Sequence, residues 1–262
     1  MNIDLGYRGR RVIVTGCASG IGRATAQALL EQGAQVQGFD VAQPDLPLAA
    51  FTRLDLRDAA AIEAAAGAVA GPVDALFNCA GIPPGRPPID VMTVNFIGAR
   101  HLTELLLPTM PPGSAIVSVS SNGGAGWRGQ LPQLRQLAAA EGFEAAAAWC
   151  RANAAVVAEG YRFSKAAIIA WTLASASTLI RRGVRINCTL PGAVRTPMLD
   201  EIERTTPRSA IDVVAQPIGR RSAPEEQAWP LLMLNSSAAG YVNGAALPVD
   251  GGFLAGVELR AG

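Results

Sequence analysis

Short runs of apolar, often β-branched residues alternate along this chain with stretches of helical periodicity. The expected strands are residues 11–15, 35–40, 51–55, 75–78, 115–119, 185–189 and 246–249. Helices are expected between them. One begins at about residue 21, a long one runs up to residue 107, and others lie near residues 58–69, 161–182 and 224–234. Strands that are apolar throughout and separated by helices are typical of a parallel sheet covered on both faces. The sequence therefore predicts a doubly wound α/β fold, with residues 1–262 forming one domain.

The alternation is interrupted between Ser121 and Tyr161. Residues 131–158 are rich in Ala, Leu, Glu and Gln and show no strand pattern. Apolar side chains are nevertheless frequent enough in this stretch to anchor helices in a core, namely Leu131, Leu134, Leu137, Phe143 and Trp149. We therefore expect an inserted pair of helices at about residues 125–160.

Composition excludes several classes of protein. The chain has 262 residues, of which 50% are hydrophobic and 16% charged, so it can bury a core and is not disordered. Its 22 basic and 21 acidic residues are interspersed, which argues against nucleic acid or an anionic membrane as a partner. The longest nearly apolar run, residues 166–180, is too short for a membrane span, and residues 12–14 are too short for a signal-peptide core. We expect a cytoplasmic protein that binds a small molecule or another protein.

The cysteines and the histidine do not form a metal-binding pattern. Cys17, Cys79, Cys150 and Cys188 are widely separated, with no C-x-x-C pair, and the one histidine, His101, is not near them in sequence. We expect neither a metal site nor a disulfide framework. The four thiols are interpreted as small buried side chains in a reducing compartment.

A glycine-rich turn follows the first expected strand and opens directly into a helix. After Thr15 the spacing is G-x-x-x-G-x-G, with Gly16, Gly20 and Gly22. Gly16 permits the tight turn, Gly20 lets the backbone approach a pyrophosphate, and Gly22 lets the helix pack on the strand. The helix N-terminus offers N–H groups to an anion. Because the spacing differs from G-x-G-x-x-G, a plain structural turn remains the alternative.

Asp40 closes the second expected strand, twenty residues after Gly20. A carboxylate there can accept hydrogen bonds from the adenosine ribose hydroxyls of a dinucleotide, and its charge would repel a 2′-phosphate. This argues for NAD over NADP. Arg23 is the nearby basic residue that would argue the reverse, and a solvated carboxylate at a strand end is the structural alternative.

Tyr161 and Lys165 lie four residues apart in a helical stretch, so their side chains share one face. A phenol titrates near pH ~10, whereas a general base works best near neutrality, so a neighbouring cation and the positive nicotinamide must lower its pKa. Lys165 is the only lysine in the chain, since the other basic residues are all arginine. A compact ammonium retained at this position indicates chemistry rather than an accidental surface charge.

Further motifs join these features along almost the whole chain. They are Thr15 to Gly22, Asp55-Leu56, Asn78-Cys79-Ala80-Gly81, Asn95, Ser120-Ser121, Tyr161 to Lys165, Pro191-Gly192, Thr196-Pro197-Met198 and Val249-Asp250-Gly251-Gly252. Together they resemble the short-chain dehydrogenase/reductase family. The resemblance implies a Rossmann-like fold, NAD as cofactor, and oxidoreductase activity on an alcohol or ketone.

The resemblance also implies a catalytic set of four residues. Tyr161 would be the general acid/base, and Lys165 would bind the nicotinamide ribose and lower the pKa of the phenol. Ser121, the second of two adjacent serines, would hold the substrate oxygen. Asn95 would anchor a water that leads protons from Lys165 to solvent.

The resemblance implies a longer set of residues for the dinucleotide. Asp55 would contact adenine, the turn from Asn78 to Gly81 would line the cofactor, and Val194 and Thr196 would fix the carboxamide. Cys79 replaces the asparagine that is more usual there. The full implied set is Gly16, Ser19, Gly20, Ile21, Gly22, Asp40, Asp55, Leu56, Asn78, Ala80, Gly81, Tyr161, Lys165, Pro191, Gly192, Val194 and Thr196.

The long spacing between Ser121 and Tyr161 resembles a bacterial subgroup that includes 3α-hydroxysteroid and coniferyl-alcohol dehydrogenases. This implies a bulky, largely apolar alcohol or ketone, aromatic or alicyclic, as substrate. Trp127 and Trp149 either line its pocket or anchor the small core of the insertion. Residues 198–212 are expected to form a mobile, loop-like lid over the substrate.

Two expectations concern assembly and an alternative function. In the family, the helices after the catalytic serine and at the catalytic tyrosine commonly build a subunit interface, so the resemblance implies a homo-oligomer, either dimer or tetramer. The insertion is expected to disturb that packing. The alternative function is a non-catalytic NAD-sensing or scaffold protein on the same fold.

Overall fold

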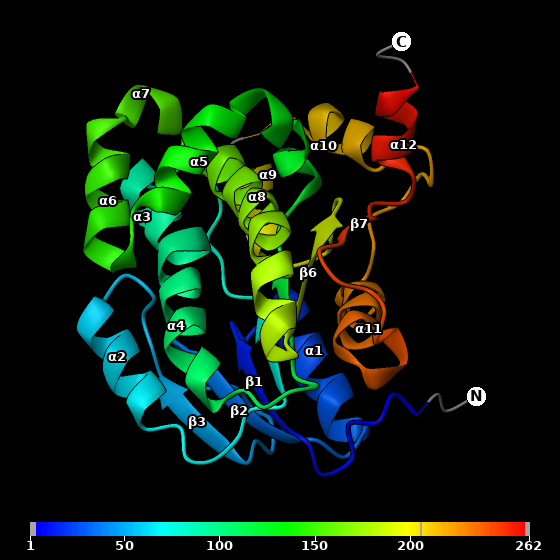
Figure 1. Ribbon diagram of the computed structural model, residues 1–262. Helices are drawn as coiled ribbons and strands as arrows, with labels where there is room; N and C mark the ends of the chain where they lie inside the picture. Colours follow the sequence, from blue (N-terminus) through cyan, green and yellow to red (C-terminus); the bar gives the residue numbers. More distant parts are fainter. Residues whose placement is uncertain (1–3, 205, 260–262) are drawn as a thin grey trace.

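Seven parallel strands form one sheet in the computed structural model, which describes residues 4–204 and 206–259 (Figure 1). The strand order is β3-β2-β1-β4-β5-β6-β7. The strands are β1 Arg11–Thr15, β2 Gln35–Asp40, β3 Ala50–Arg53, β4 Ala75–Asn78, β5 Ala115–Val119, β6 Arg185–Pro191 and β7 Ala246–Val249. The order reverses at β1, which lies between β2 and β4. The predicted doubly wound α/β class is confirmed.

Two predicted strand ends are wrong. β3 ends at Arg53 rather than at residue 55, because Leu54 donates its N–H to Asp40 and the chain then turns away from the sheet. β6 runs on to Pro191 rather than ending at residue 189, because it continues to pair with β7 as far as the Pro191–Val249 pair.

Alternate residues of the strands enter two separate cores, one on each face of the sheet. Val12 and Val14 of β1 belong to the core under helices α1 (Gly20–Glu31) and α11 (Pro224–Asn235), which pack side by side. Ile13 belongs to the other core, under α2 (Ala59–Gly67), α4 (Gly98–Leu106) and α8 (Tyr161–Leu179). Burial of both faces explains why the strands are apolar throughout.

The helical run before β5 is not one regular helix. It consists of α3 (Pro88–Met92), a π-helical turn η1 (Thr93–Ile97), α4 and a short 3₁₀ turn η2 (Leu107–Thr109). The π-helical turn contains Asn95. Such turns occur frequently at functional sites, because the extra residue re-aims a side chain.

Three helices, rather than the predicted pair, follow the 3₁₀ segment η3 (Asn122–Gln130). They are α5 (Leu131–Ala139), α6 (Gly142–Ala152) and α7 (Ala154–Val157), in green at the upper left of Figure 1. Leu134 and Leu137 of α5 and Phe143 of α6 join the core under α4 and α8. The apolar anchors predicted from the sequence therefore attach these helices to the sheet domain.

The segment expected to be a loop-like lid contains two helices, α9 (Pro197–Glu203) and α10 (Arg208–Val214), so that expectation is wrong. Thr196 caps α9, with its hydroxyl accepting a hydrogen bond from the N–H of Leu199 at 3.3 Å. Pro197 occupies the first helical position, where its fixed backbone angle favours a helix. These two residues are a helix-start signal that the interpretation of the segment as loop overlooked.

The remaining helical segments close the domain. They are η4 (Ile180–Arg182), η5 (Ser237–Ala239) and α12 (Phe253–Glu258). The stretch Tyr161–Arg182 is long and apolar enough to cross a membrane, and 61% of its most apolar window is buried inside the protein. Burial of that extent is typical of a core helix.

Candidate active site

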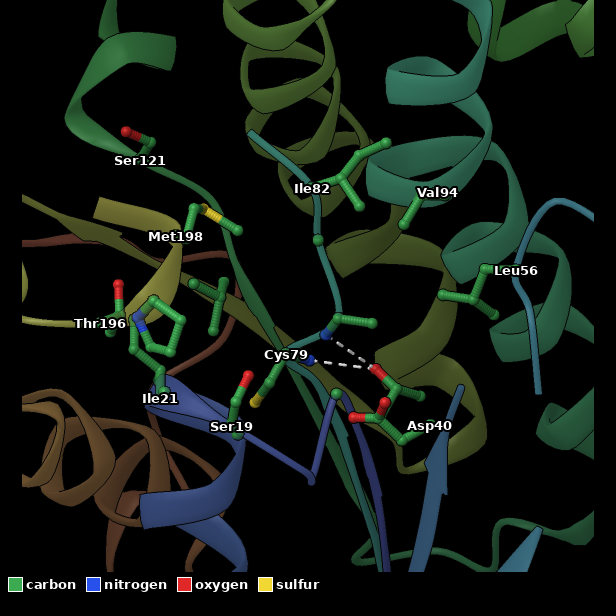
Figure 2. A pocket seen from close by; sticks show the side chains of 18 of the residues that line it. Ser19, Ile21, Asp40, Leu56, Cys79, Ile82, Val94, Ser121, Thr196 and Met198 are labelled. Carbon is green, nitrogen blue, oxygen red and sulfur yellow. Dashed lines mark hydrogen bonds between the residues drawn. The ribbon is translucent and has the colours of Figure 1, made fainter. Parts of the chain in front are cut away.

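A cleft of about 540 Å³ lies at the carboxyl ends of the strands. Residues that follow or end β1, β2, β4, β5 and β6 all line it, because the carboxyl ends of parallel strands meet at one edge of the sheet. In Figure 2, Asp40 lies toward one end of the labelled set and Ser121 toward the other. Thr196 and Met198 lie on one side, and Ile82, Val94 and Leu56 lie across from them.

The glycine-rich turn has the close packing that its sequence predicts. Gly16 has a φ of +71°, and a Cβ there would lie 2.7 Å from the backbone nitrogen of Ala80. A Cβ on Gly22 would overlap the carbonyl oxygen of Gly16. Ser19, the N-cap of α1, makes no capping hydrogen bond with its side chain and faces the cleft. The tightly packed turn and the first backbone N–H groups of α1 together form a site that fits a phosphate group.

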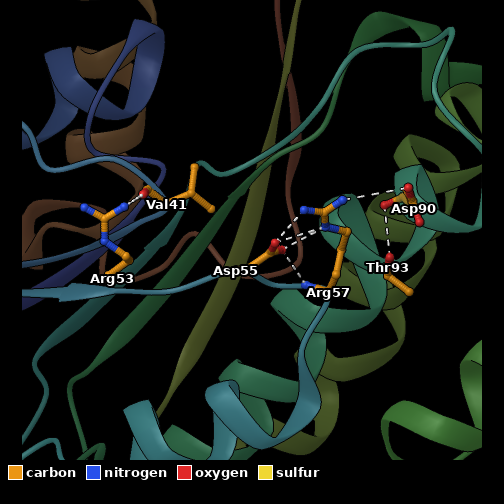
Figure 3. A network of polar contacts seen from close by, with 6 residues as sticks. All are labelled: Val41, Arg53, Asp55, Arg57, Asp90 and Thr93. Atoms are coloured by element: carbon orange, nitrogen blue, oxygen red, sulfur yellow. Dashed lines mark hydrogen bonds and ion pairs between the residues drawn. The ribbon is translucent and has the colours of Figure 1, made fainter.

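Asp40 ties the end of β2 to this turn. Its two carboxylate oxygens accept hydrogen bonds from the N–H groups of Ala18 at 2.8 Å and Ala42 at 3.0 Å. The side chain is partly exposed and lines the cleft. Arg23 is exposed and is not among the residues that line the cleft. Arg53 of β3, which sequence reasoning did not consider, pairs in register with Asp40 and donates to the carbonyl of Val41 at 2.8 Å (Figure 3).

Asp55 lines the cleft as an ion pair rather than as an isolated carboxylate. Arg57 donates to both of its oxygens, with the shortest contact at 2.6 Å, and lies 3.8 Å from Asp90 (Figure 3). The hydrogen bond from Arg57 lowers the pKa of Asp55. Arg57 and Asp90 were not predicted as site residues, because the contact between them depends on the fold.

The two adjacent serines have different environments. The hydroxyl of Ser120 is buried and donates to the carbonyl of Lys165 at 2.8 Å. Ser121 caps η3, accepting from the N–H of Gly123 at 3.1 Å, and its hydroxyl donates to the amide oxygen of Asn122 at 3.4 Å. Ser121 lines the cleft with Tyr161, and it is the serine that acts on the pKa of the phenol.

Tyr161 begins α8 and its side chain lines the cleft. Burial raises the pKa of Tyr161, the hydrogen bond from Ser121 lowers it in part, and the negative charge of Glu159 raises it further. The sequence argument required this pKa to be lowered. The protein's own groups leave it above its ordinary value, because burial outweighs the hydrogen bond.

Lys165 lies one helical turn after Tyr161 and is only 4% exposed. Its Nζ is 5.7 Å from the centroid of the Tyr161 ring and donates to the carbonyl of Val119 at 2.9 Å. Burial lowers the pKa of Lys165 to about 8. The predicted convergence of the two side chains is therefore present in the structure.

Asn95 lies behind the cleft rather than on its wall. Its amide oxygen accepts from the N–H of Ile82 at 2.8 Å, and its amide nitrogen donates to the carbonyl of Ile82 and to Ser164, both at 3.2 Å. The side chain thus fixes the start of one cleft wall. The water-anchoring role implied by the resemblance stays a prediction.

Asn78 does not line the cleft, although it was placed in the cofactor set. Its side chain is buried and donates to Thr103 at 3.0 Å and Ser118 at 3.3 Å. Since side chains alternate along a strand, Asn78 projects to the same face as Leu76, toward α4. It stabilises the strand end, and the residues that follow it form the wall.

The other predicted cofactor residues that were not described above do line the cleft. They are Gly20, Ile21, Leu56, Ala80, Gly81, Pro191, Gly192, Val194 and Thr196. Trp127 and Trp149 are not among the lining residues, and Trp149 stacks on Phe163 with ring centroids 6.1 Å apart. The interpretation of these tryptophans as core anchors is the one that the structure supports.

Sequence reasoning missed most of the apolar wall. This wall consists of Ile82, Pro87, Val94, Met198, Leu199 and Ile202. Cys79 also lines the cleft, and burial raises the pKa of its thiol to about 12, which keeps it uncharged. Ile82 directly follows the Asn78 to Gly81 motif, so extending that motif by one residue would have identified it, and Met198 is the last residue of the Thr196-Pro197-Met198 motif.

Two family models match the chain. The model described as short chain dehydrogenase covers residues 10–132, and the model described as enoyl-(acyl carrier protein) reductase covers residues 145–254. Residues 133–144, which hold most of α5 and the start of α6, lie between the two matches.

Named relatives match nearly the whole chain. Coniferyl-alcohol dehydrogenase from Pseudomonas sp. (strain HR199) is 35% identical, over 93% of this chain and 96% of the relative. A 3-alpha-hydroxysteroid dehydrogenase/carbonyl reductase from Comamonas testosteroni is 33% identical, over 92% of this chain and 95% of the relative. The crystal structure of 3-alpha-hydroxysteroid dehydrogenase from Pseudomonas sp. B-0831, complexed with NADH, superimposes with a TM-score of 0.81 at 29% identity and covers 95% of this chain and 99% of that one.

Proposed function

The chain belongs to the short-chain dehydrogenase/reductase family of oxidoreductases, and from this premise we propose that it transfers a hydride between NAD and a bulky, largely apolar alcohol or ketone. The single observation that carries the proposal is the cluster at the cleft wall. Ser121, Tyr161 and Lys165 all line the cleft, the Ser121 hydroxyl lowers the pKa of the phenol, and Lys165 lies one helical turn after Tyr161.

The geometry supports a distinct role for each member of the cluster. Tyr161 takes the proton of the substrate hydroxyl in oxidation and returns it in reduction. Ser121 donates a hydrogen bond to the substrate oxygen, alongside the phenol. Lys165 presents the nearest positive charge to the phenol, from an ammonium fixed by the Val119 carbonyl. Asn95 holds the backbone of Ile82, which lines the same cleft.

The residues at the other end of the cleft fit a nicotinamide dinucleotide. When bound, such a cofactor supplies the acceptor or donor of the hydride. The glycine turn and the start of α1 would hold its pyrophosphate, because the lack of a Cβ at Gly16 and Gly22 keeps the turn tight and the first N–H groups of a helix favour an anion. Asp40 would accept from the adenosine ribose, and its negative charge favours NAD over NADP.

The apolar wall supports an aromatic or alicyclic substrate. Ile82, Met198 and Ile202 present hydrocarbon to the cleft, and the relatives named above act on coniferyl alcohol and on 3-alpha-hydroxysteroids. Hydroxysteroids and aryl or alicyclic alcohols are therefore the first compounds to test.

The test is a rate measurement with purified protein. Initial rates are compared for a 3α-hydroxysteroid, a cinnamyl-type alcohol and a simple cyclic alcohol, each with NAD and with NADP, from the absorbance of the reduced nicotinamide. We expect turnover with NAD. Tyr161→Phe should abolish turnover while NAD still binds in calorimetry, because the ring is kept and only the hydroxyl is removed.

The same experiment tests the alternative function, a non-catalytic NAD-sensing or scaffold protein. A sensor would bind NAD, oxidise none of the alcohols, and keep its response to a partner in Tyr161→Phe. The grouping of Ser121, Tyr161 and Lys165 at one cleft favours the enzyme, since binding NAD alone does not need it.

We also propose a cytoplasmic homo-oligomer, either dimer or tetramer. The free cysteines suit a reducing compartment. Helices α5 and α6 pack onto the core beside α4 and α8, whereas Trp229, Met233 and Tyr241 are exposed on and after α11, near the open edge of β7. Light scattering tests the assembly, and Trp229→Glu is expected to weaken it.

A further inference from the structure

An ion pair joins the two walls of the cleft. Arg86 belongs to the segment between β4 and α3, and Glu201 belongs to α9. Their side chains meet at 2.5 Å, between Nη2 of Arg86 and Oε1 of Glu201, although 115 positions separate them in the sequence. Arg86 itself lines the cleft.

Among the described residues that line the cleft, the cations are Arg57, Arg86 and Lys165. Arg57 is held by Asp55 through both carboxylate oxygens, and Lys165 is buried and donates to the Val119 carbonyl. Arg86 differs from both. It contacts one carboxylate oxygen of Glu201, and Glu201 is not a lining residue.

The pair between Arg86 and Glu201 is easily opened. Their side chains are 52% and 40% exposed, so water screens their attraction and solvates Glu201 when it is released. The recorded contact also uses one guanidinium nitrogen and one carboxylate oxygen. A guanidinium presents a planar fork that matches both oxygens of a carboxylate, so an incoming carboxylate can make a better contact.

The same two segments that carry this pair also supply apolar side chains to the cleft. Ile82 and Pro87 come from the segment of Arg86, and Met198 and Ile202 come from the helix of Glu201. A cation beside hydrocarbon walls suits a ligand with an apolar body and an anionic end.

We propose, on the premise of the proposed function, that Arg86 binds a carboxylate of the substrate. The preferred substrates are then cyclic hydroxy acids or the matching keto acids, with the reacting carbon and the carboxylate at opposite ends of an apolar body. In this structure Glu201 forms an ion pair with Arg86, and the substrate carboxylate displaces Glu201 when it binds.

The test compares acids with neutral analogues. The probes are 4-hydroxycyclohexanecarboxylate and 3-(4-hydroxycyclohexyl)propanoate, each beside its carboxamide, with NAD and the intact chain. We expect Arg86→Gln to lower the acid-to-amide ratio of kcat/KM about 10- to 100-fold. Glu201→Gln removes the competing carboxylate and is expected to raise that ratio about 2- to 5-fold. Arg181→Gln, at an exposed arginine in η4 just after the end of α8, is the matched control and should leave it unchanged.

Opposite signs for the two variants support the proposal. It is overturned if Arg86→Gln and Glu201→Gln change acid and amide equally, because the pair would then only fasten one wall to the other. If the unmodified protein oxidises neither these probes nor the alcohols used to test the proposed function, the proposed function has failed. Calorimetric binding of acid and amide to the protein with NAD, in the unmodified chain and in Arg86→Gln, then decides the role of Arg86 separately.

Discussion

The Nζ of Lys165 lies 5.7 Å from the centroid of the Tyr161 ring, with its hydrogen bond directed to the Val119 carbonyl rather than to the phenol. Lys165 is buried and Tyr161 is partly buried, and burial moves their pKa values in opposite directions. The pKa of Tyr161 is raised and that of Lys165 is lowered to about 8. Each group is thereby favoured in its neutral form, and the first two predictions test this pair.

Replacing Lys165 with methionine should stabilise the fold at neutral pH. The ordinary pKa of 10.5 falls to about 8 in the folded chain, a difference equivalent to about 3 kcal/mol. Below pH ~8 the lysine is charged in both states, so the full cost of its burial is present. Losing the hydrogen bond to Val119 costs about 1 kcal/mol, so Lys165→Met should gain about 2 kcal/mol in the free energy of unfolding at pH ~7.

The stability difference between Lys165→Met and the unmodified chain should shrink as the pH rises from about 8 to about 10.5. In that window the folded chain releases the lysine proton while the unfolded chain keeps it, so only the unmodified protein gains stability. Urea unfolding at both ends of the window measures this. A variant that is less stable at neutral pH would show that the buried ammonium stabilises the fold.

Neutralising Glu159 should move the pH profile of alcohol oxidation toward lower pH. The negative charge of Glu159 raises the pKa of Tyr161, and Glu159→Gln removes that charge while keeping an acceptor for the N–H groups of Tyr161 and Arg162. Ser121→Ala should shift the profile the other way, because its hydrogen bond lowers the same pKa. The measurement is kcat/KM against pH. Equal shifts in both variants would contradict the assignment of Tyr161 as the titrating base.

Adding a methyl group at Gly124 should displace Ser121 from Tyr161. A Cβ at Gly124 would lie 2.6 Å from the backbone carbon of Lys165, so η3 must move away from α8. We expect Gly124→Ala to lower the free energy of unfolding by about 1–3 kcal/mol and to reduce kcat. Gly126, in the same segment, has open space around its Cα, so Gly126→Ala should leave both quantities nearly unchanged. If the two variants behave alike, contact between η3 and α8 does not position the serine.

Removing the charge of Asp40 should weaken the preference for NAD. Asp40→Asn keeps the size of the side chain, and we expect the NAD-to-NADP ratio of kcat/KM to fall about tenfold, equivalent to about 1.4 kcal/mol. Arg23→Gln is the control, because Arg23 does not line the cleft. A strict NADP preference in the unmodified protein would remove the role assigned to Asp40.

The parts of this molecule that depend on local sequence were predictable. Short, fully apolar runs alternating with helical stretches predicted the sheet, and the glycines after β1 predicted the turn, where a Cβ at Gly22 would overlap the Gly16 carbonyl. The helical spacing of Tyr161 and Lys165 placed them on one face. Each of these inferences uses residues within a few positions of one another.

The parts that depend on distant segments were not predictable in the same way. Arg86 meets Glu201 only because the chain after β4 and helix α9 face each other across the cleft. Arg57 reaches Asp90 for a similar reason. The prediction for Asn78 was wrong for a different reason. The motif from Asn78 to Gly81 was assigned to the cofactor as a unit, although the alternation of side chains along β4 directs the Asn78 side chain toward α4, away from the cleft.

The solitary lysine has a practical consequence. Its ε-amine and the α-amine of the N-terminus are the two amines that the sequence offers to an acylating reagent. Lys165 is nearly enclosed, and a pKa of about 8 leaves it partly nucleophilic near neutrality. The acylation rate at this one side chain, followed by mass spectrometry, would report how often the interior of the cleft becomes reachable, without any engineered label.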